Sequence, residues 1–194
     1  MSDVIKINGF TNETLGWKAW LDVVNVETAT AEQLRILEAS HPQAKTSDYY
    51  LLLVHEPEIL DHRSETYNAI MYAPGGAQRA ERELGALTVS RINGCVYCAS
   101  VHAQRFEQLT KRNQIVADVF TDPATAGDNE RDKAIIKLAT ALTESPDNFD
   151  PAHVQALKDL GMSEKEILDI IHSVSIFGWA NRLMLNLGEP VFPA

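Results

Sequence analysis

Two cysteines, a histidine and a glutamate lie within twenty residues of one another, from Glu83 to His102. Cys95 and Cys98 are the only cysteines in the chain and form a C-x-x-C pair. In a reducing compartment such a pair is more often redox-active or metal-binding than part of a disulfide framework. This stretch therefore predicts thiol chemistry assisted by an acid and a base.

If a helix begins at the first cysteine, the spacing places both thiols and the imidazole on one helix face. Helical residues three or four positions apart are neighbours, with Cβ atoms ~5–6 Å apart. Asn93-Gly94 breaks the preceding helix and places Cys95 in a first helical turn, where free N–H groups and the helix dipole favour a thiolate. His102 is nearer to Cys98 and is expected to activate it. Glu83 must come from the preceding helix to orient the imidazole.

Other interpretations of these residues stay open. The two cysteines could be small core residues, and the four side chains together could bind zinc. No second C-x-x-C and no H-x-x-H motif is present to complete a structural zinc site. Alone, His102 could be a surface histidine and Glu83 one acid among many. Their coincidence around the thiols favours a joint catalytic site, without a cofactor.

The elements that must position these residues are predicted to be helices. Apolar residues recur at helical spacing and almost nothing alternates with period two. Capping boxes begin at Thr30 and Ser163, and Pro57 suits a first helical turn. The sequence predicts an all-α fold of about eight helices, with the C-x-x-C pair at the N-terminus of a central helix. Helical segments are expected over residues 30–39, 47–54, 57–71, 77–92, 95–110, 115–120, 130–142, 151–160 and 163–187.

The N-terminal forty residues are less informative. The pattern of residues 15–26 is compatible with either a short helix or irregular packing. Pro74-Gly75-Gly76 is the strongest break in the chain. It predicts a soft boundary between an N-terminal helical part, residues 1–74, and a core that carries the cysteines, residues 75–194, together forming one compact unit.

Composition limits the environment and the partners. A chain of 194 residues with 45% hydrophobic residues can bury a sizeable core. No apolar run approaches the ~20 residues that cross a bilayer, and no signal-peptide pattern is evident, so a cytoplasmic location is expected. The net charge of -10 repels polyanions, which argues against nucleic acid or an anionic membrane as a partner.

The spacing of the four site residues resembles the E-x11-C-x-x-C-x-x-x-H signature of the AhpD-like alkylhydroperoxidases, in the carboxymuconolactone decarboxylase superfamily. The stretches HEPEILDHRSETYNAIM and EKEILDIIHSVSIFGWANRLMLNLGEP are similar to the subgroup called uncharacterized peroxidase-related proteins. The resemblance covers roughly residues 45–190. It implies an AhpD-like helical fold, a homo-oligomer (dimer or hexamer), and reduction of organic hydroperoxides.

The resemblance also implies roles for individual residues. Cys98 would be the peroxidatic cysteine, Cys95 the resolving cysteine, and Glu83 with His102 the proton relay. A dithiol reductant, either a lipoylated or a thioredoxin-like protein, would regenerate the pair. Some members place a histidine where this chain has Tyr97, so Tyr97 is a candidate for part of the relay. A decarboxylase and a non-enzymatic metal-binding or interaction protein are the alternatives.

Four residues of the last predicted helix and four tyrosines complete the candidates. We expect core packing for His172 and Trp179, with lining of the thiol pocket as the alternative for both. Asn181 and Arg182 interrupt an apolar stretch and are expected to cap or to pair at an interface. The tyrosines could shape a hydrophobic entrance for an organic peroxide: Tyr49, Tyr50, Tyr67 and Tyr72.

Overall fold

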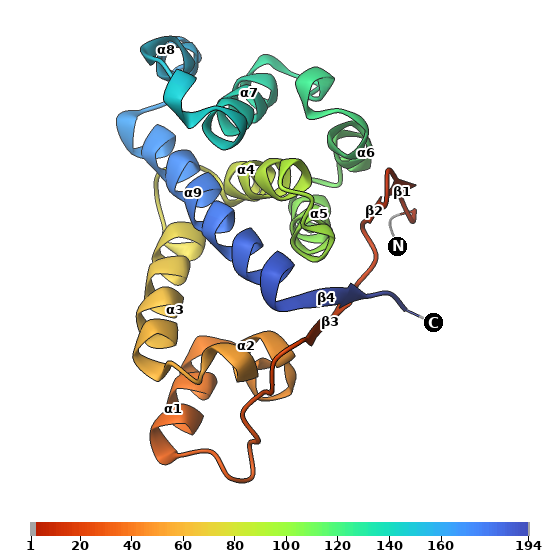
Figure 1. The fold of residues 1–194 in the computed structure, drawn as a ribbon. Coiled ribbons are helices and arrows are strands. Elements are labelled where there is room, and N and C mark those ends of the chain that lie inside the picture. The colour runs from red at the N-terminus through yellow and green to blue at the C-terminus, as the bar shows by residue number, and fades with distance from the viewer. Residues whose placement is uncertain (1–2, 194) are drawn as a thin grey trace.

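The computed structural model describes residues 3–193, which form α-helices and four short strands (Figure 1). Nine α-helices lie within these residues, one for each predicted helical segment, so the all-α prediction is confirmed. The helices are α1 (Ala31–Ser40), α2 (Asp48–Leu53), α3 (Pro57–Tyr72), α4 (Arg79–Ile92), α5 (Val96–Thr110), α6 (Asn113–Thr121), α7 (Glu130–Glu144), α8 (Pro151–Asp159) and α9 (Glu164–Leu187).

Several helices begin and end at the signals present in the sequence. Thr30 caps α1 and Ser163 caps α9, and both form the predicted capping boxes. Pro57 is in the first turn of α3. Between α4 and α5 the chain turns at Gly94, where φ is +76°. Glycine adopts this left-handed conformation at little cost, so α5 can fold back and pack against α4.

The first twenty residues differ from the prediction. β1 (Lys6–Ile7) pairs with β2 (Phe10–Thr11), and β3 (Gly16–Ala19) pairs with β4 (Gly188–Val191), both antiparallel. The helix considered for residues 15–26 was wrong, because β3 finds its hydrogen-bond partners at the other end of the chain. Such a distant partner leaves no local pattern. In Figure 1 this two-stranded ribbon leaves the C-terminal end of α9 after a bend.

Helix α4 is the central helix of the molecule, and α3, α5, α6, α7 and α9 contact it. All ten residues from 81 to 90 are buried. Gly85 permits the close approach of α9, because a Cβ there would lie 3.3 Å from Val174 Cγ2 and 3.7 Å from Ile170 Cγ2. Since α4 is enclosed on every side, its polar side chains, including Glu83, must find partners inside the protein.

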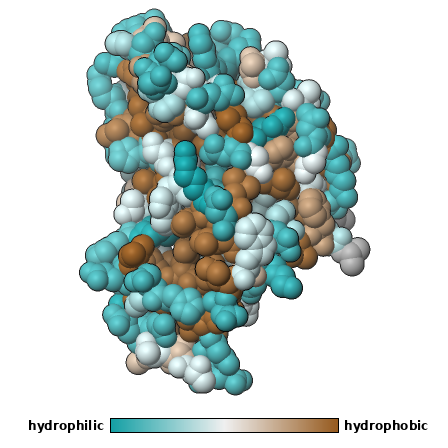
Figure 2. All heavy atoms as spheres, in the orientation of Figure 1, coloured by the Kyte–Doolittle hydropathy of each residue, from teal (hydrophilic) through white to brown (hydrophobic). Residues whose placement is uncertain are grey.

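Helix α9 runs across the molecule, with α1–α3 on one side and α4–α8 on the other (Figure 1). Hydrophobic surface gathers where the C-terminal half of α9 faces α2 and α3 (Figure 2). Among the helices of residues 3–193, none has the length and apolar character needed to cross a bilayer. The division of the chain at residue 74 stays a prediction.

Candidate active site

Helices α4 and α5 bring an acid and a base into buried contact. His102 Nδ1 lies 2.6 Å from Glu83 Oε2, and the two side chains are 2% and 0% exposed. Arg79, one turn before Glu83 on α4, donates through Nε to Glu83 Oε1 at 2.7 Å. Burial opposes ionisation of Glu83, but the charges and hydrogen bonds of His102 and Arg79 outweigh it and hold the pKa of Glu83 below its ordinary value. The ionised carboxylate therefore accepts the Nδ1–H of His102.

The second imidazole nitrogen of His102 is available to a bound molecule. Within residues 3–193, the ring forms its one hydrogen bond through Nδ1. The ring centroid lies 3.9 Å from that of Phe177, which holds the imidazole edge-on. His102 also lines a cavity of about 580 Å³. A proton held at Nε2 can thus pass to or from a ligand in this cavity.

The two cysteines meet at the start of α5. Cys95 is the N-cap residue and Cys98 lies in the first turn. Both are unbridged and buried, and their Sγ atoms are 2.8 Å apart. The hydrogen bond with Cys98 lowers the pKa of Cys95, whereas the proton shared with Cys95, together with burial, raises the pKa of Cys98 well above its ordinary value. Ionisation of this pair is thus favoured at Cys95 over Cys98.

These shifts bear on the expected roles of the two thiols. A thiolate favoured at the helix start, Cys95, fits the helix-terminus argument. Activation of Cys98 by His102 stays a prediction, since no hydrogen bond joins these side chains within the described residues. The Cys98 sulfur has the sulfur of Cys95 within hydrogen-bond distance, at 2.8 Å.

The cavity distinguishes the two sulfurs. Cys98 lines the cavity, together with Tyr97 and His102, whereas Cys95 does not. A bound molecule therefore meets Cys98, and Cys95 lies behind it. Burial raises the pKa of Tyr97, so its phenol stays protonated and can donate a hydrogen bond. The four tyrosines considered for an entrance also line this cavity.

Two residues of α9 lie away from the thiols. Trp179 is 39% exposed and lines a second cleft, and His172 is exposed, so core packing was wrong for both. Successive helical residues are about 100° apart around the axis, so residue 179 points away from the face that carries residue 180. The residues of α9 that line the thiol cavity are Phe177, Ala180 and Met184.

Asn181 is a site residue whose role the sequence did not reveal. It is fully buried, donates to Ser90 Oγ at 3.1 Å and accepts from Asn93 Nδ2 at 3.0 Å. Its side chain adds to the lowering of the pKa of Cys95 and acts against the rise in the pKa of Cys98. Asn181 thus ties α9 to the α4–α5 turn beside the thiols. For Arg79 a local signal existed, because it precedes Glu83 by four positions, the spacing of helical ion pairs.

No metal centre is visible at the thiols. Within residues 3–193, no three His, Cys, Asp or Glu side chains are placed to hold a metal ion together. The carboxylate of Glu83 is bonded to His102 and Arg79. The zinc alternative therefore finds no support in the geometry.

Comparison with protein families matches residues 57–141 to the carboxymuconolactone decarboxylase family. The chain contains a domain of this family. The match begins at the start of α3, ends in α7, and includes all four residues of the signature. A search of curated proteins found no match.

Solved structures share the fold of this chain. An uncharacterized peroxidase-related protein from Ralstonia eutropha JMP134, described as an alkylhydroperoxidase AhpD core, has a TM-score of 0.75 and 23% identity, covering 87% of this chain and 90% of that one. A peroxidase-related protein from Silicibacter sp. TM1040 has a TM-score of 0.71 and 22% identity, covering 88% and 92%. The debrominase Bmp8 has a TM-score of 0.68 and 20% identity, covering 85% and 88%. The AhpD-like fold and the peroxidase-related resemblance are confirmed.

Proposed function

We propose that this protein is a thiol-dependent peroxidase that reduces organic hydroperoxides. The observation that carries the proposal is the position of Cys98 at the wall of the cavity, with the Cys95 sulfur 2.8 Å behind it. His102, paired with Glu83, lines the same cavity. A nucleophile, a resolving thiol and a proton donor thus surround one space that can hold an organic molecule.

In the proposed resting state, Cys95 is a thiolate and His102 carries the proton that balances it. Cys98 passes its proton to Cys95, and its thiolate attacks the terminal oxygen of the hydroperoxide. The O–O bond breaks, Cys98 becomes a sulfenic acid, and the alkoxide takes the Nε2 proton of His102 and leaves as an alcohol. Glu83 stabilises the imidazolium before this transfer.

The second half of the cycle returns the pair to the dithiol. The protonated Cys95 sulfur attacks the sulfenic sulfur of Cys98, an S–S bond forms, and water leaves with the Cys95 proton. A dithiol reductant then exchanges with this disulfide and is itself oxidised. Because Cys98 is the sulfur at the cavity, the reductant must enter there, which favours a slender dithiol such as a lipoyl arm over a broad protein surface.

Thiol counting tests the proposal. One equivalent of cumene hydroperoxide should remove both free thiols per chain, and a dithiol should restore them. Cys98→Ser should abolish peroxide consumption. Cys95→Ser should consume one equivalent and stop at a sulfenic acid that a dimedone probe captures. If Cys98→Ser consumes peroxide at the wild-type rate, the proposal is wrong.

Reductive dehalogenation is a second candidate reaction. The fold is shared with the debrominase Bmp8, and the cavity has aromatic walls that suit a planar ring. The two electrons and two protons of the cysteine dithiol would convert the carbon–halogen bond into a carbon–hydrogen bond and a hydrogen halide. The cysteine pair would again be left as a disulfide. Bromide release from a bromophenol in the presence of a dithiol would favour this reaction over peroxide reduction.

A decarboxylase, the remaining enzymatic alternative, does not need the cysteine pair. It would keep its activity in the Cys95→Ser, Cys98→Ser double variant, which the peroxidase and the dehalogenase would not.

Self-association is also proposed, on the resemblance to oligomeric relatives. The second cleft offers apolar surface for it, with Leu21 and Ile59 each 59% exposed. Sedimentation of the protein would give its oligomeric state.

A further inference from the structure

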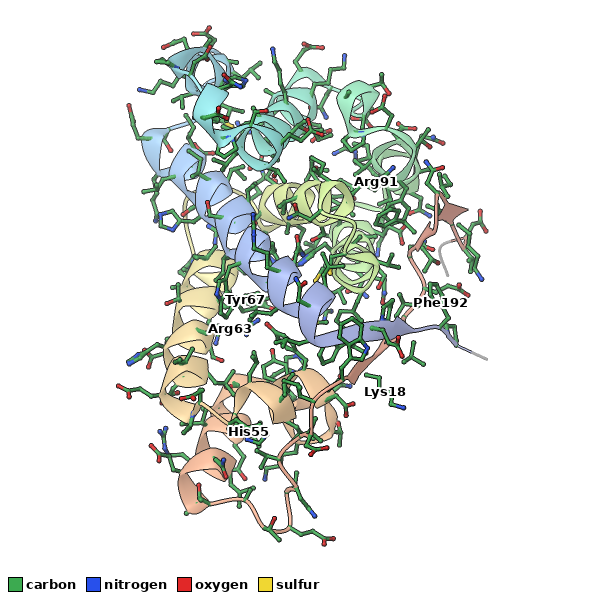
Figure 3. All side chains as sticks on the ribbon, viewed as in Figure 1. Lys18, His55, Arg63, Tyr67, Arg91 and Phe192 are labelled. Atoms are coloured by element: carbon green, nitrogen blue, oxygen red, sulfur yellow. The ribbon has the colours of Figure 1, made fainter. Side chains whose placement is uncertain are left out.

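The cavity beside Cys98 contains an arginine without an acidic partner. Arg63 comes from α3 and lies on the side of that helix that faces α9, next to Tyr67 (Figure 3). Its guanidinium carbon is 4.6 Å from the centroid of the Tyr67 ring and 5.6 Å from that of Tyr50. Within residues 3–193 its one hydrogen bond is a long one, from Nη1 to Tyr50 Oη at 3.5 Å, and its Nε is buried without a partner.

The carboxylates of the cavity are already neutralised by other cations. Glu38 accepts from Lys45 Nζ at 2.5 Å, on the outer part of the lining. Glu83 is held by His102 and Arg79. Arg63 is half-buried, and a guanidinium removed from water without a counter-ion carries a cost. Since no described carboxylate pairs with Arg63, an anion from outside the chain would satisfy it.

A second donor without a partner lies beside this arginine. Tyr49 is 7% exposed, its hydroxyl is buried with no hydrogen-bond partner in the described residues, and it lines the same cavity. Its ring centroid is 5.8 Å from the Arg63 guanidinium carbon. Burial raises the pKa of Tyr49 far above its ordinary value, so the phenol remains a donor. A guanidinium and a protonated phenol together form a site for an oxyanion.

Tyr49 also connects this site to the reacting sulfur. It packs in one apolar cluster with Cys95 and Cys98, and the Arg63 guanidinium carbon lies 5.8 Å from its ring centroid. An anionic group at Arg63 and a reactive group at Cys98 would therefore both lie close to one tyrosine ring. The remaining walls are aromatic and suit a compact apolar or aromatic body.

We infer that Arg63 and Tyr49 bind the carboxylate of an organic acid whose aromatic or apolar body lies along the tyrosine walls and whose reducible group reaches Cys98. The planar fork of one arginine can hold a carboxylate with two hydrogen bonds, and the aromatic walls favour an organic acid over an inorganic anion. The inference rests on the proposed function for the reducible group, but the carboxylate site stands on its own geometry.

Direct binding tests the site without any turnover. Titration calorimetry should show that wild-type protein binds 4-tert-butylbenzoate at least ~10-fold more tightly than the neutral 4-tert-butylbenzamide, since a charged hydrogen-bonded pair is lost in the amide. Arg63→Met should reduce this ratio to about 1, and Arg63→Lys, which keeps the charge, should retain part of it. Arg105→Met is the matched control, because Arg105 also lines the cavity but is exposed, and it should keep the preference.

Three results would overturn the inference: equal affinity for the acid and the amide, loss of the preference in Arg105→Met rather than Arg63→Met, or an unchanged preference in a folded Arg63→Met protein. Circular dichroism establishes folding of each variant.

Turnover separates the inference from the proposed function. Wild-type protein should consume 4-carboxycumene hydroperoxide with a kcat/KM ~10-fold above that of cumene hydroperoxide, and Arg63→Met should lose that advantage. If benzoate binds at Arg63 but neither peroxide is consumed, the proposed function fails while the carboxylate site stands. If both peroxides are consumed equally by wild type and Arg63→Met, the carboxylate inference fails while the function stands.

Discussion

Two arginines on neighbouring helices show how differently one side chain type can be held. Arg82 on α4 donates to the carbonyl oxygens of Ile70, Ala73 and Gly75 at 2.8, 3.2 and 2.7 Å, and to Asp169 at 2.9 Å. It ties the end of α3 to α9. Arg63 on α3 has one long hydrogen bond and three tyrosine rings around it.

The comparison distinguishes Arg82, which stabilises the fold, from Arg63, which is proposed to bind a ligand. Arg82 donates four hydrogen bonds through its Nη atoms, although its Nε, like that of Arg63, has no partner in the described residues, so its removal leaves buried acceptors unpaired. Arg63 is poorly satisfied in the described residues, so its removal takes away a cost of folding as well as a contact. Stability measurements can therefore test what each arginine does.

The largest expected effect is that of Arg82→Met. Removing one partner of a buried ion pair leaves Asp169 and three carbonyls without their donor, and should lower the free energy of unfolding by about 3 kcal/mol. Urea unfolding at pH 7 measures it. Arg35→Met is the control, because the exposed Arg35–Asp61 pair should contribute under about 1 kcal/mol. If Arg82→Met lowered the free energy of unfolding by less than about 1 kcal/mol, a structural role for Arg82 would be contradicted.

Glu83→Gln should have an intermediate effect that depends on pH. Because the folded pKa of Glu83 is lowered, its ionised form stabilises the protein above the unfolded pKa of about 4.3, and this contribution is lost as pH falls through the folded pKa. Glu83→Gln should therefore be less stable than wild type by about 2 kcal/mol at pH 7. The difference should shrink as pH falls below about 4.

Urea unfolding of both proteins across this pH range measures that difference. Glu130→Gln is a matched control, because the Glu130–Lys133 pair is exposed on both sides and should show little pH-dependent change. A difference that grows in acid would contradict the ion-pair account of Glu83.

The smallest expected effect is that of Arg63→Met on stability. Replacing a poorly satisfied charge by an apolar side chain of similar length should leave the free energy of unfolding within about 1 kcal/mol of wild type, or raise it. The same urea titration measures it. If Arg63→Met lowered the free energy of unfolding as much as Arg82→Met, both arginines would be structural. The inference that Arg63 binds a ligand would then be contradicted.

The features that the sequence predicted well are those with a local cause. Helix positions follow from apolar periodicity, and the capping boxes at Thr30 and Ser163 act within one helical turn. Glu83, Cys95, Cys98 and His102 could be grouped because a short turn joins their two helices. The features that escaped prediction involve distant partners. Asn181 reaches Ser90 from 91 positions away, and β3 pairs with a strand at the end of α9.

By itself, the sequence determined a helical protein with a thiol pair, an acid and a base on adjacent helices, because periodicity and short-range spacing decide those features. Only the tertiary structure decided that Cys98 lines the cavity while Cys95 does not. It also decided that Arg63 lines this cavity without an acidic partner among residues 3–193. Burial and pKa depend on which helices enclose a side chain, and that enclosure is made by contacts far apart in the chain.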